Sequence, residues 1–395
     1  MLEISKQRGA APFDTARLDQ LMDDAGIEVL LATSKHNVQY LLGGHRAFFF
    51  DTMDAIGVTR YLPVFVYPKS APQKAGYFGH RMEGYQVAVK PFWVSEVNTK
   101  SSGAIDVMER AAGYVRQLLA RPQRIGVELS FLPADAAATL RRAFPDAELQ
   151  DALFMLERLR ARKTPEELAK LRLASDLVID SMLAVFDSYG PGATKAQMAE
   201  ALRREETMRG LIFDYCLIAA GSSLNRAPSE QRWEKGDVLS LDSGGNYRGY
   251  IGDLARMGIA GKPDSELEDL LGEVEVIQQA ARKPIRAGVN GGEIYQAAAA
   301  VLHRSKLHNH IDFLAHGMGL VSHEAPRLTG SGPVPYDAYD ADKPLDAGMV
   351  ISVETTLTHP RRGFIKLEDT VAVTAAGFEV YGDRARGWNR AGGAG

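Results

Sequence analysis

The sequence of 395 residues has almost no cysteine, no long hydrophobic run and no excess of positive charge. Its single cysteine, Cys216, excludes an internal disulfide framework and fits a reducing cytoplasm. No run approaches the roughly 18 apolar residues of a membrane span, and Met1–Lys6 lacks the basic start and apolar stretch of a signal peptide. A formal net charge of −4 argues against a nucleic-acid-binding surface. We therefore expect a cytoplasmic protein with neither a nucleic-acid nor a membrane partner.

The length exceeds what one hydrophobic core usually supports, so we expect two domains. Thr164-Pro165-Glu166 combines a capping threonine, a proline at the first helical position and an acid in the first turn, which predicts the start of a long helix. We place the boundary just before it and predict domains at 1–157 and 158–385. The residues after Arg384 end in alanine and glycine and are expected to fray.

Helix and strand patterns differ between the two halves of the chain. In the first domain, helices are predicted at 16–25, 105–119 and 133–144, and strands at 28–32, 63–67 and 124–128, which indicates an α/β domain. In the second domain, helices are predicted at 166–189, 195–208, 265–283 and 292–302, and strand pairs at 238–242 with 250–259 and 350–357 with 364–373. Helix pairs that alternate with strand pairs indicate a curved sheet backed by helices.

Five potential metal ligands lie on or beside the strands of the second domain. Four carboxylates and one imidazole suit two hard or borderline divalent cations, because the four negative charges balance two such ions. Ions of this kind lower the pKa of water and polarise a carbonyl group, which is the chemistry of a two-metal hydrolase. The five residues are Asp242, Asp253, His316, Glu354 and Glu368.

Hairpin geometry gives a reason for the spacing of the four carboxylates. A hairpin centred near Tyr247 and Arg248 would set the two aspartates opposite each other on one face of the sheet. A second hairpin centred near Arg361 would do the same for the two glutamates. His316 would reach the site from a third segment.

These motifs resemble the creatinase, prolidase and aminopeptidase-P family of pita-bread metallohydrolases over nearly the whole chain. The resemblance includes Asn37–Gly44 in the first domain, Arg162–Leu168 at the entry to the second, the five ligand motifs, and His323-Glu324-Ala325-Pro326 after the ligand histidine. It implies an α+β fold, in which a pita-bread catalytic domain follows a smaller creatinase-like α/β domain. It also implies two bound ions, manganese first, with cobalt, zinc or iron as alternatives.

The resemblance further implies roles for residues near the ligands. His323 is expected to act in catalysis, because a histidine with a pKa near neutrality can donate to the developing oxyanion or to the leaving group. Glu324 is expected to orient it or the ligands. Lys366 lies two residues before Glu368 on the same strand and is expected to neutralise a ligand carboxylate, where relatives usually have arginine.

One position departs from the peptidase pattern. Peptidase relatives usually carry a substrate-contacting histidine 17 residues before the first ligand, where this sequence has Asn225. Asparagine donates a hydrogen bond but carries no proton in catalysis, and it suits a plain turn equally well. Arg226 beside it is expected to bind a carboxylate. Asn225, Arg226 and Lys366 are therefore candidate substrate contacts.

Three functions remain open. The first is a hydrolase for a short peptide or another small amide, of the Xaa-Pro dipeptidase or aminopeptidase type. The second keeps the fold and metals but acts on a non-peptide substrate, as in creatinase-like or ectoine-hydrolase-like enzymes or dimethylsulfoniopropionate lyases. The third is a non-enzymatic binding module, which the retention of all five ligands disfavours. The resemblance also implies a homodimer, in which His80, Arg81 and Trp93 of one chain help to close the other chain's pocket.

Overall fold

The computed structural model describes residues 10–47, 54, 57–332 and 336–393, so Met1–Lys6 lies outside the described residues. The chain forms two compact units, Met1–Leu159 and Arg160–Gly395. Among the helices that are described, none combines the length and the apolar character that a membrane crossing requires. Each unit contains its own pair of hydrophobic cores, so each is described separately below.

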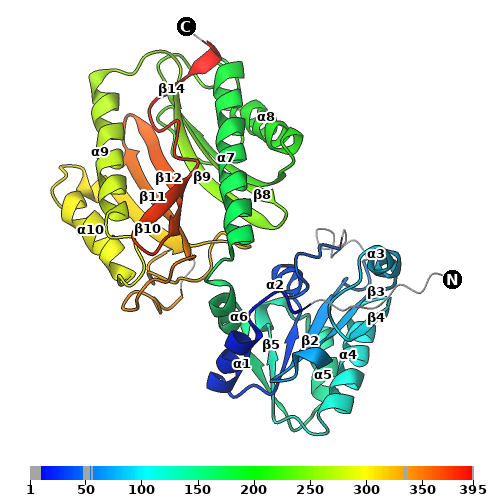
Figure 1. The fold of residues 1–395 in the computed structure, drawn as a ribbon. Coiled ribbons are helices and arrows are strands. Elements are labelled where there is room, and N and C mark those ends of the chain that lie inside the picture. Colours follow the sequence, from blue (N-terminus) through cyan, green and yellow to red (C-terminus); the bar gives the residue numbers. More distant parts are fainter. Residues whose placement is uncertain (1–9, 48–53, 55–56, 333–335, 394–395) are drawn as a thin grey trace. The chain divides into compact units, whose positions relative to one another are not determined.

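The first unit is an α/β domain built on a six-stranded mixed sheet with the order β4-β3-β2-β1-β5-β6 (Figure 1). Residues of β1 alternate between two cores, since Leu30 packs with α1 and α6 whereas Leu31 packs with α4 and α5. Helices therefore cover both faces of the sheet, and the predicted α/β domain is confirmed. The elements are α1 Thr15–Asp24, β1 Val29–Ala32, α2 Lys35–Leu41, β2 Val64–Pro68, η2 Pro72–Lys74, β3 Gly76–His80, η3 Arg81–Glu83, α3 Gly84–Val89, β4 Glu96–Ser101, α4 Ala104–Leu118, β5 Arg124–Val127, η4 Leu129–Phe131, α5 Ala134–Ala143, β6 Glu148–Asp151 and α6 Leu153–Arg160.

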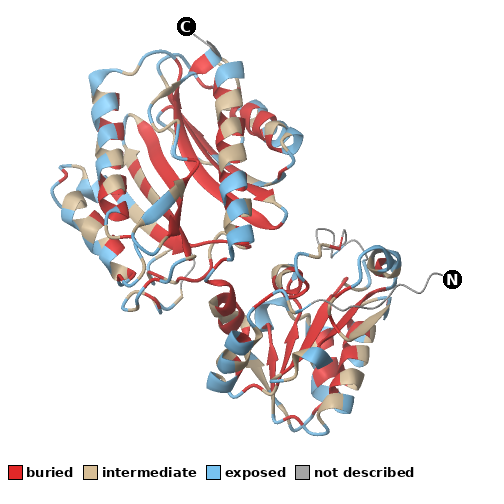
Figure 2. Cartoon of the chain, in the orientation of Figure 1, coloured by how far each residue is buried: buried red, intermediate tan, exposed pale blue. Residues whose placement is uncertain are grey.

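The second unit is an antiparallel sheet with the order β10-β11-β12-β9-β8-β7, which β13 and β14 extend beside β12 and β9. Its strands are mostly buried, whereas α7 and α9 alternate buried and exposed positions (Figure 2). The predicted α+β pita-bread architecture is confirmed. The elements are α7 Pro165–Ser188, α8 Lys195–Met208, β7 Ile212–Ala220, β8 Val238–Tyr247, β9 Tyr250–Ile259, α9 Ser265–Arg282, α10 Gly292–Leu302, η5 His308–His310, β10 Ile311–Gly317, β11 Val350–His359, β12 Gly363–Val373, β13 Phe378–Tyr381, β14 Asn389–Arg390 and η6 Ala391–Gly393.

The sheet of the second unit has one face under the helices and one face free for a site. Successive strand residues point to opposite faces, and β12 shows the alternation clearly, because Leu367 joins the core under α9 whereas Glu368 lines a pocket on the other face. One core lies between α9, α10 and β10–β12, and another between α7, α8 and β7–β9. Each helix pair therefore backs one half of the sheet.

A network of buried charges on the helix-covered face joins the two halves. β12 and β9 pair through Glu368 and Ala255. Beside this contact, the carboxylate of Asp369 forms ion pairs with Arg256 at 3.0 Å, with Arg386 at 2.6 Å and with Arg282. Although burial alone would raise the pKa of Asp369, these arginines hold it well below its usual range. The carboxylate is thus ionised and anchors the strand that carries Glu368.

The second predicted hairpin register is confirmed, but the first is wrong by two residues. Glu354 pairs directly with Glu368, whereas Asp242 pairs with Ala255 and Asp253 pairs with Gly244. The turn explains the shift. Arg248 and Gly249 both have positive φ, 53° and 100°, as in a two-residue hairpin turn, so Tyr247 pairs with Tyr250 and the centre lies further along the chain. Because the shift is even, both aspartates still face the same side.

The expectation that the C-terminal residues fray is also wrong for those that the structure describes. Arg386 pairs with Glu275 and Asp369, and the indole of Trp388 donates to the Leu267 carbonyl at 3.2 Å. Asn389 belongs to β14, which pairs with β9. The segment is rich in alanine and glycine, but its few large side chains bind it to the sheet and to α9.

Candidate metal centre

Three of the five predicted ligands lie in one row across the sheet. The pairing partners along this row are Glu354 on β11, Glu368 on β12, Ala255 on β9 and Asp242 on β8. Paired residues of neighbouring antiparallel strands point to the same face. Register alone therefore directs three carboxylates from distant parts of the sequence to one place.

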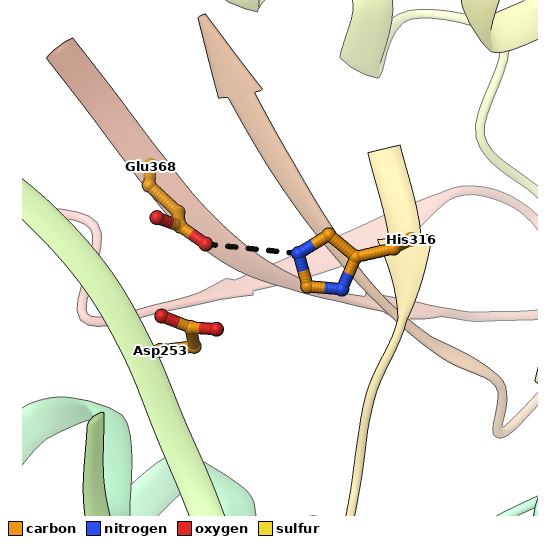
Figure 3. Close-up of side chains that lie close together, drawn as sticks. All are labelled: Asp253, His316 and Glu368. Atoms are coloured by element: carbon orange, nitrogen blue, oxygen red, sulfur yellow. Dashed lines mark ion pairs between the residues drawn. The ribbon is translucent and has the colours of Figure 1, made fainter. Parts of the chain in front are cut away.

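The other two predicted ligands lie on the same face of the sheet, two residues away from this row along their strands. Asp253 is two residues before Ala255, and His316 on β10 pairs with Ser352 two residues before Glu354. The side chains of Asp253, His316 and Glu368 converge (Figure 3). Each offers one ligand atom, and the three atoms lie within 4.8 Å of one another. His316 Nε2 lies 3.8 Å from Glu368 Oε1.

Two hydroxyl groups that the sequence analysis missed bind the ligand carboxylates. Tyr215 on β7 donates to Asp253 Oδ1, and Ser352 donates to Glu368 Oε1 at 2.7 Å. Gly244 leaves room for the tyrosine ring, because a Cβ at this position would lie 2.3 Å from the ring. The sequence signal is weak, because a tyrosine in an apolar strand next to Cys216 has the pattern of a core residue.

The acids of this cluster raise one another's pKa values. Burial comes first and the neighbouring carboxylates second, and together they raise the pKa of Asp253 well above its usual range and also raise that of Glu354. For Glu368 the balance is reversed, because Lys366 and His316 outweigh burial and hold its pKa low. Buried carboxylates that face one another in this way are stabilised by any cation that they can share.

Two basic side chains already neutralise part of this charge. Lys366 Nζ lies 2.6 Å from Asp242 Oδ2 and within ion-pair distance of Glu354 and Glu368. Arg226 also pairs with Asp242, and its guanidinium stacks 4.7 Å above the ring of Phe364. The predicted neutralising position of Lys366 matches this geometry. Arg226 was predicted to bind a carboxylate, and here its partner is the ligand Asp242.

The donor set fits a divalent metal ion. One imidazole nitrogen and two carboxylates that converge on one point are ligands used by manganese, iron, cobalt and zinc alike. Glu368 Oε2 is buried and lies 2.7 Å from the Lys366 ammonium, and each carboxylate oxygen has more than one lone pair. The carboxylates therefore retain lone pairs for a cation.

His323 lies against the ligand histidine. The two imidazole rings are stacked with centroids 3.8 Å apart, and both rings line the same pocket. Burial, with help from the charge of His316, lowers the pKa of His323 to about 4. A neutral ring at pH 7 can donate one N–H but is not a strong acid.

Glu324, which was expected to orient His323 or the ligands, forms its ion pairs with two basic residues away from the ligand cluster. It is buried, and its carboxylate pairs with Arg160 at 2.7 Å and with Lys163 at 3.1 Å. These contacts outweigh burial and lower its pKa. Glu324 therefore fixes the loop beside His323 to the segment that precedes α7.

Asn225 lies at an exposed turn and is not among the residues that line the pocket. Its side-chain oxygen accepts a hydrogen bond from the backbone N–H of Ala227 at 2.9 Å. Its backbone carbonyl accepts another from the ammonium group of Lys195 at 2.6 Å. This is the plain turn that the sequence left open as the alternative to a substrate contact.

Comparison with known proteins agrees with this geometry. Residues 169–375 match metallopeptidase family M24, and residues 15–162 match the creatinase/prolidase N-terminal domain. A Bacillus subtilis protein described as an uncharacterized peptidase is 26% identical over 91% of this chain and 95% of its own length. The Xaa-Pro dipeptidase of Pyrococcus furiosus is 23% identical over 83% of this chain and 92% of its own. A solved Xaa-Pro dipeptidase from Bacillus anthracis superimposes with a TM-score of 0.79 at 23% identity, covering 95% and 98% of the two chains.

The family match covers more than half of the chain, and the five predicted ligands lie inside the matched region. Membership implies divalent metal ions, which the convergent donor set fits. The chain therefore belongs to metallopeptidase family M24 and is a metal-dependent hydrolase of the creatinase, prolidase and aminopeptidase-P group.

Proposed function

We propose that this hydrolase cleaves the amide bond of a small substrate, with Xaa-Pro dipeptides or short Xaa-Pro peptides as the first candidates. The observation that carries the proposal is the convergence of Asp253, His316 and Glu368 in a pocket that His323 also lines. The Xaa-Pro dipeptidases among the relatives support the substrate class.

We propose two divalent ions, manganese first and cobalt, zinc or iron as alternatives. Asp253, His316, Glu354 and Glu368 would hold one ion, and Asp242 with the shared carboxylates would hold the other. When bound, such ions activate water and polarise the scissile carbonyl. Tyr215 and Ser352 would keep the ligand carboxylates in position through the hydrogen bonds that their hydroxyl groups donate.

We assign His323 the role of a neutral donor. Its pKa of about 4 means that at pH 7 it offers an N–H without carrying a charge. Such a group can stabilise negative charge as it develops on the carbonyl oxygen of the substrate. Arg226 lines the same pocket and has a partly exposed guanidinium, so it is the basic group that a carboxylate end of the substrate would meet first.

A non-peptide substrate is the second candidate, and Asn225 is the observation that favours it. The residue forms an exposed turn where peptidase relatives are expected to have a substrate-contacting histidine. A substrate without a peptide bond would not need that contact. Ectoine, creatine and dimethylsulfoniopropionate represent this group, and the last of them is cleaved after proton abstraction and not by amide hydrolysis.

One screen separates the two candidates. Manganese-loaded enzyme is assayed against Xaa-Pro dipeptides, longer Xaa-Pro peptides, ectoine, creatine and dimethylsulfoniopropionate, with Glu354→Gln as the inactive control. We expect turnover of Xaa-Pro substrates. Turnover of a non-peptide substrate alone would move the second candidate to first place, and no turnover of any of these compounds would contradict both.

We also propose a cytoplasmic homodimer. The buried free thiol of Cys216 is compatible with a reducing compartment. Of the three residues expected to reach a partner's pocket, Arg81 is exposed, whereas His80 is buried and Trp93 packs against its own core. Light scattering should give twice the 43.1 kDa of one chain, and a monomer at micromolar concentration would contradict the proposal.

A further inference from the structure

Asp312 lines the same pocket as the predicted metal ligands but stands apart from them. It lies on β10 four residues before His316, so both side chains point to the pocket face. Four residues correspond to about 13 Å of strand. The convergent ligands Asp253, His316 and Glu368 are buried, whereas Asp312 is exposed. Asp312 therefore belongs to the solvent-accessible wall of the pocket and not to the metal centre.

The carboxylate of Asp312 also differs from the other acids of the pocket in its partners. Within the described part of the chain, no ion pair or hydrogen bond engages it, whereas each ligand carboxylate has a partner. Thr356 pairs opposite Asp312, and Lys366 pairs with Thr356 on the next strand. The Lys366 ammonium is directed to three ligand carboxylates instead. An acid left without a partner in a pocket attracts a cation from solution.

Arg226 supplies the opposite charge on the other side of the pocket. Its guanidinium stacks 4.7 Å above the ring of Phe364 on β12, and its side chain is 31% exposed. β11 separates β10 from β12, so the two strands lie two spacings apart, about 10 Å. Thr356 and Thr358 of β11 line the pocket between Asp312 and Phe364. The pocket therefore presents an anionic and a cationic group across a short polar floor.

The dimensions suit a small molecule that carries both charges. The pocket has a volume of about 540 Å³, which is within the range of small-molecule sites. An extended dipeptide spans roughly 7 Å, and the long side chain of Arg226 covers the remaining distance. The ligands Glu354 and Glu368 lie two residues from Thr356 and Lys366 along their strands. A molecule held at both ends would thus have its central amide bond beside the ligand row.

We propose that Asp312 is a specificity-determining residue that binds a cationic group of the substrate. Arg226 meets the carboxylate at the other end. The inference rests on the proposed function and narrows its substrate class to small molecules with both charges. In a free dipeptide, the cation is the α-amino group or a basic side chain of the first residue. Either ammonium group donates charge-assisted hydrogen bonds to a carboxylate.

The test compares three dipeptides that differ in positive charge. Lysyl-proline has two ammonium groups, norleucyl-proline keeps only the α-amino group on the same carbon chain, and N-acetyl-norleucyl-proline has neither. We measure kcat/KM with the manganese-loaded wild type, Asp312→Asn and Asp269→Asn. Asp269 is an exposed acid on α9, so it controls for the loss of one negative charge away from the pocket. The ratio of the first two substrates reports on the side chain, and that of the last two on the α-amino group.

We expect one of the two ratios to fall about tenfold in Asp312→Asn and to stay at the wild-type value in Asp269→Asn. The ratio that falls identifies which ammonium group Asp312 binds. A change of less than about threefold in both ratios overturns the inference. Circular dichroism checks the fold of each variant, and Asp312→Ser repeats the test if Asp312→Asn is not folded.

The outcomes separate the inference from the function on which it rests. Any dipeptide that is not cleaved is titrated into the same manganese-loaded proteins by calorimetry, and dissociation constants replace kcat/KM in the two ratios. If no dipeptide is cleaved but binding depends on a cation and on Asp312, the peptidase proposal fails and the inference stands. If binding shows no dependence on the cation, the inference is overturned, whether or not the dipeptides are cleaved.

Discussion

The two faces of the catalytic sheet pair their buried charges differently beside the same strand. On the pocket face, the four predicted ligand carboxylates lie together near Lys366, Arg226 and His316. On the helix-covered face, Asp369 pairs with Arg256, Arg282 and Arg386, and Asp383 also contacts two of these arginines. Adjacent residues of β12 take part in both arrangements, because Glu368 points to one face and Asp369 to the other.

The pocket face therefore has the character of a binding site, whereas the helix-covered face holds the strands and helices together. An excess of buried acids is unfavourable until a cation arrives, so the pocket face is built to bind one. The arginines of the other face already have carboxylate partners, and Arg256 also donates to the backbone carbonyls of Glu368, Gly382 and Arg384. Substitutions on the pocket face should therefore change metal binding and activity, whereas substitutions on the other face should change stability.

Asp253→Asn should have the largest effect on activity. Replacing the carboxylate removes a ligand and leaves Tyr215 with a neutral partner. We expect a loss of about a thousandfold or more in kcat and of at least one metal ion per chain. Elemental analysis and steady-state kinetics measure both, with Asp269→Asn on the exposed side of α9 as control. Full metal content with full activity would contradict the assignment.

His323→Ala should lower kcat by a factor of about 10² to 10⁴ and leave the metal content unchanged. The ring stacks on His316 without belonging to the convergent ligand group, so its loss removes a donor and not a ligand. His303→Ala, exposed at the end of α10, is the matched control. A fall in metal content together with kcat would make His323 a structural support of the site instead.

Asp369→Asn should destabilise the fold by about 3–5 kcal/mol, because it leaves buried arginines without their shared partner. Asp383→Asn is the matched control, since Asp383 contacts Arg282 and Arg386 but is 40% exposed. It should cost less than about 1 kcal/mol. Denaturant unfolding of both metal-free variants measures the two losses, and equal losses would show that burial of the pair is not the cause.

The same network predicts a dependence of stability on pH. Since the folded-state pKa of Asp369 lies below its ordinary value, its contribution is complete above that ordinary value. It should decline as the pH falls below the ordinary range of an aspartate and approaches the folded-state pKa. In Asp369→Asn, the acid branch of the stability curve of metal-free protein should be flatter than in the wild type. Parallel acid branches would contradict this.

Tyr215→Phe should have the smallest effect. It removes the hydroxyl that donates to Asp253 but keeps the ring that packs over Gly244. Loss of such an outer contact typically lowers metal affinity by about 10- to 100-fold, and we expect the lower end. Titration against a chelator measures it, with Tyr247→Phe at the hairpin turn as control. An affinity equal to that of the wild type would show that the hydroxyl does not support the ligand.

The sequence alone predicted the main helices of the second unit and the candidate metal ligands, but not β7 or β10. Local periodicity predicted α8 and α10 with the bounds that the structure has, and the predicted hairpin put the two aspartates on the same face, although with other pairing partners than the structure shows. Turn geometry decided what periodicity could not. The positive φ of Arg248 moved the first hairpin by two residues, and no hydrophobic pattern records that angle.

Only the tertiary structure decided which side chains meet. Tyr215 reaches Asp253 across 38 positions of sequence, and Lys366 reaches Asp242 across 124. Such contacts depend on strand order and on side-chain direction, neither of which leaves a local signal. The sequence could predict a lysine on the ligand face because strands alternate with a period of two. That its ammonium lies among three carboxylates follows from the strand order β11-β12-β9-β8, which brings the strands of all three acids into one sheet.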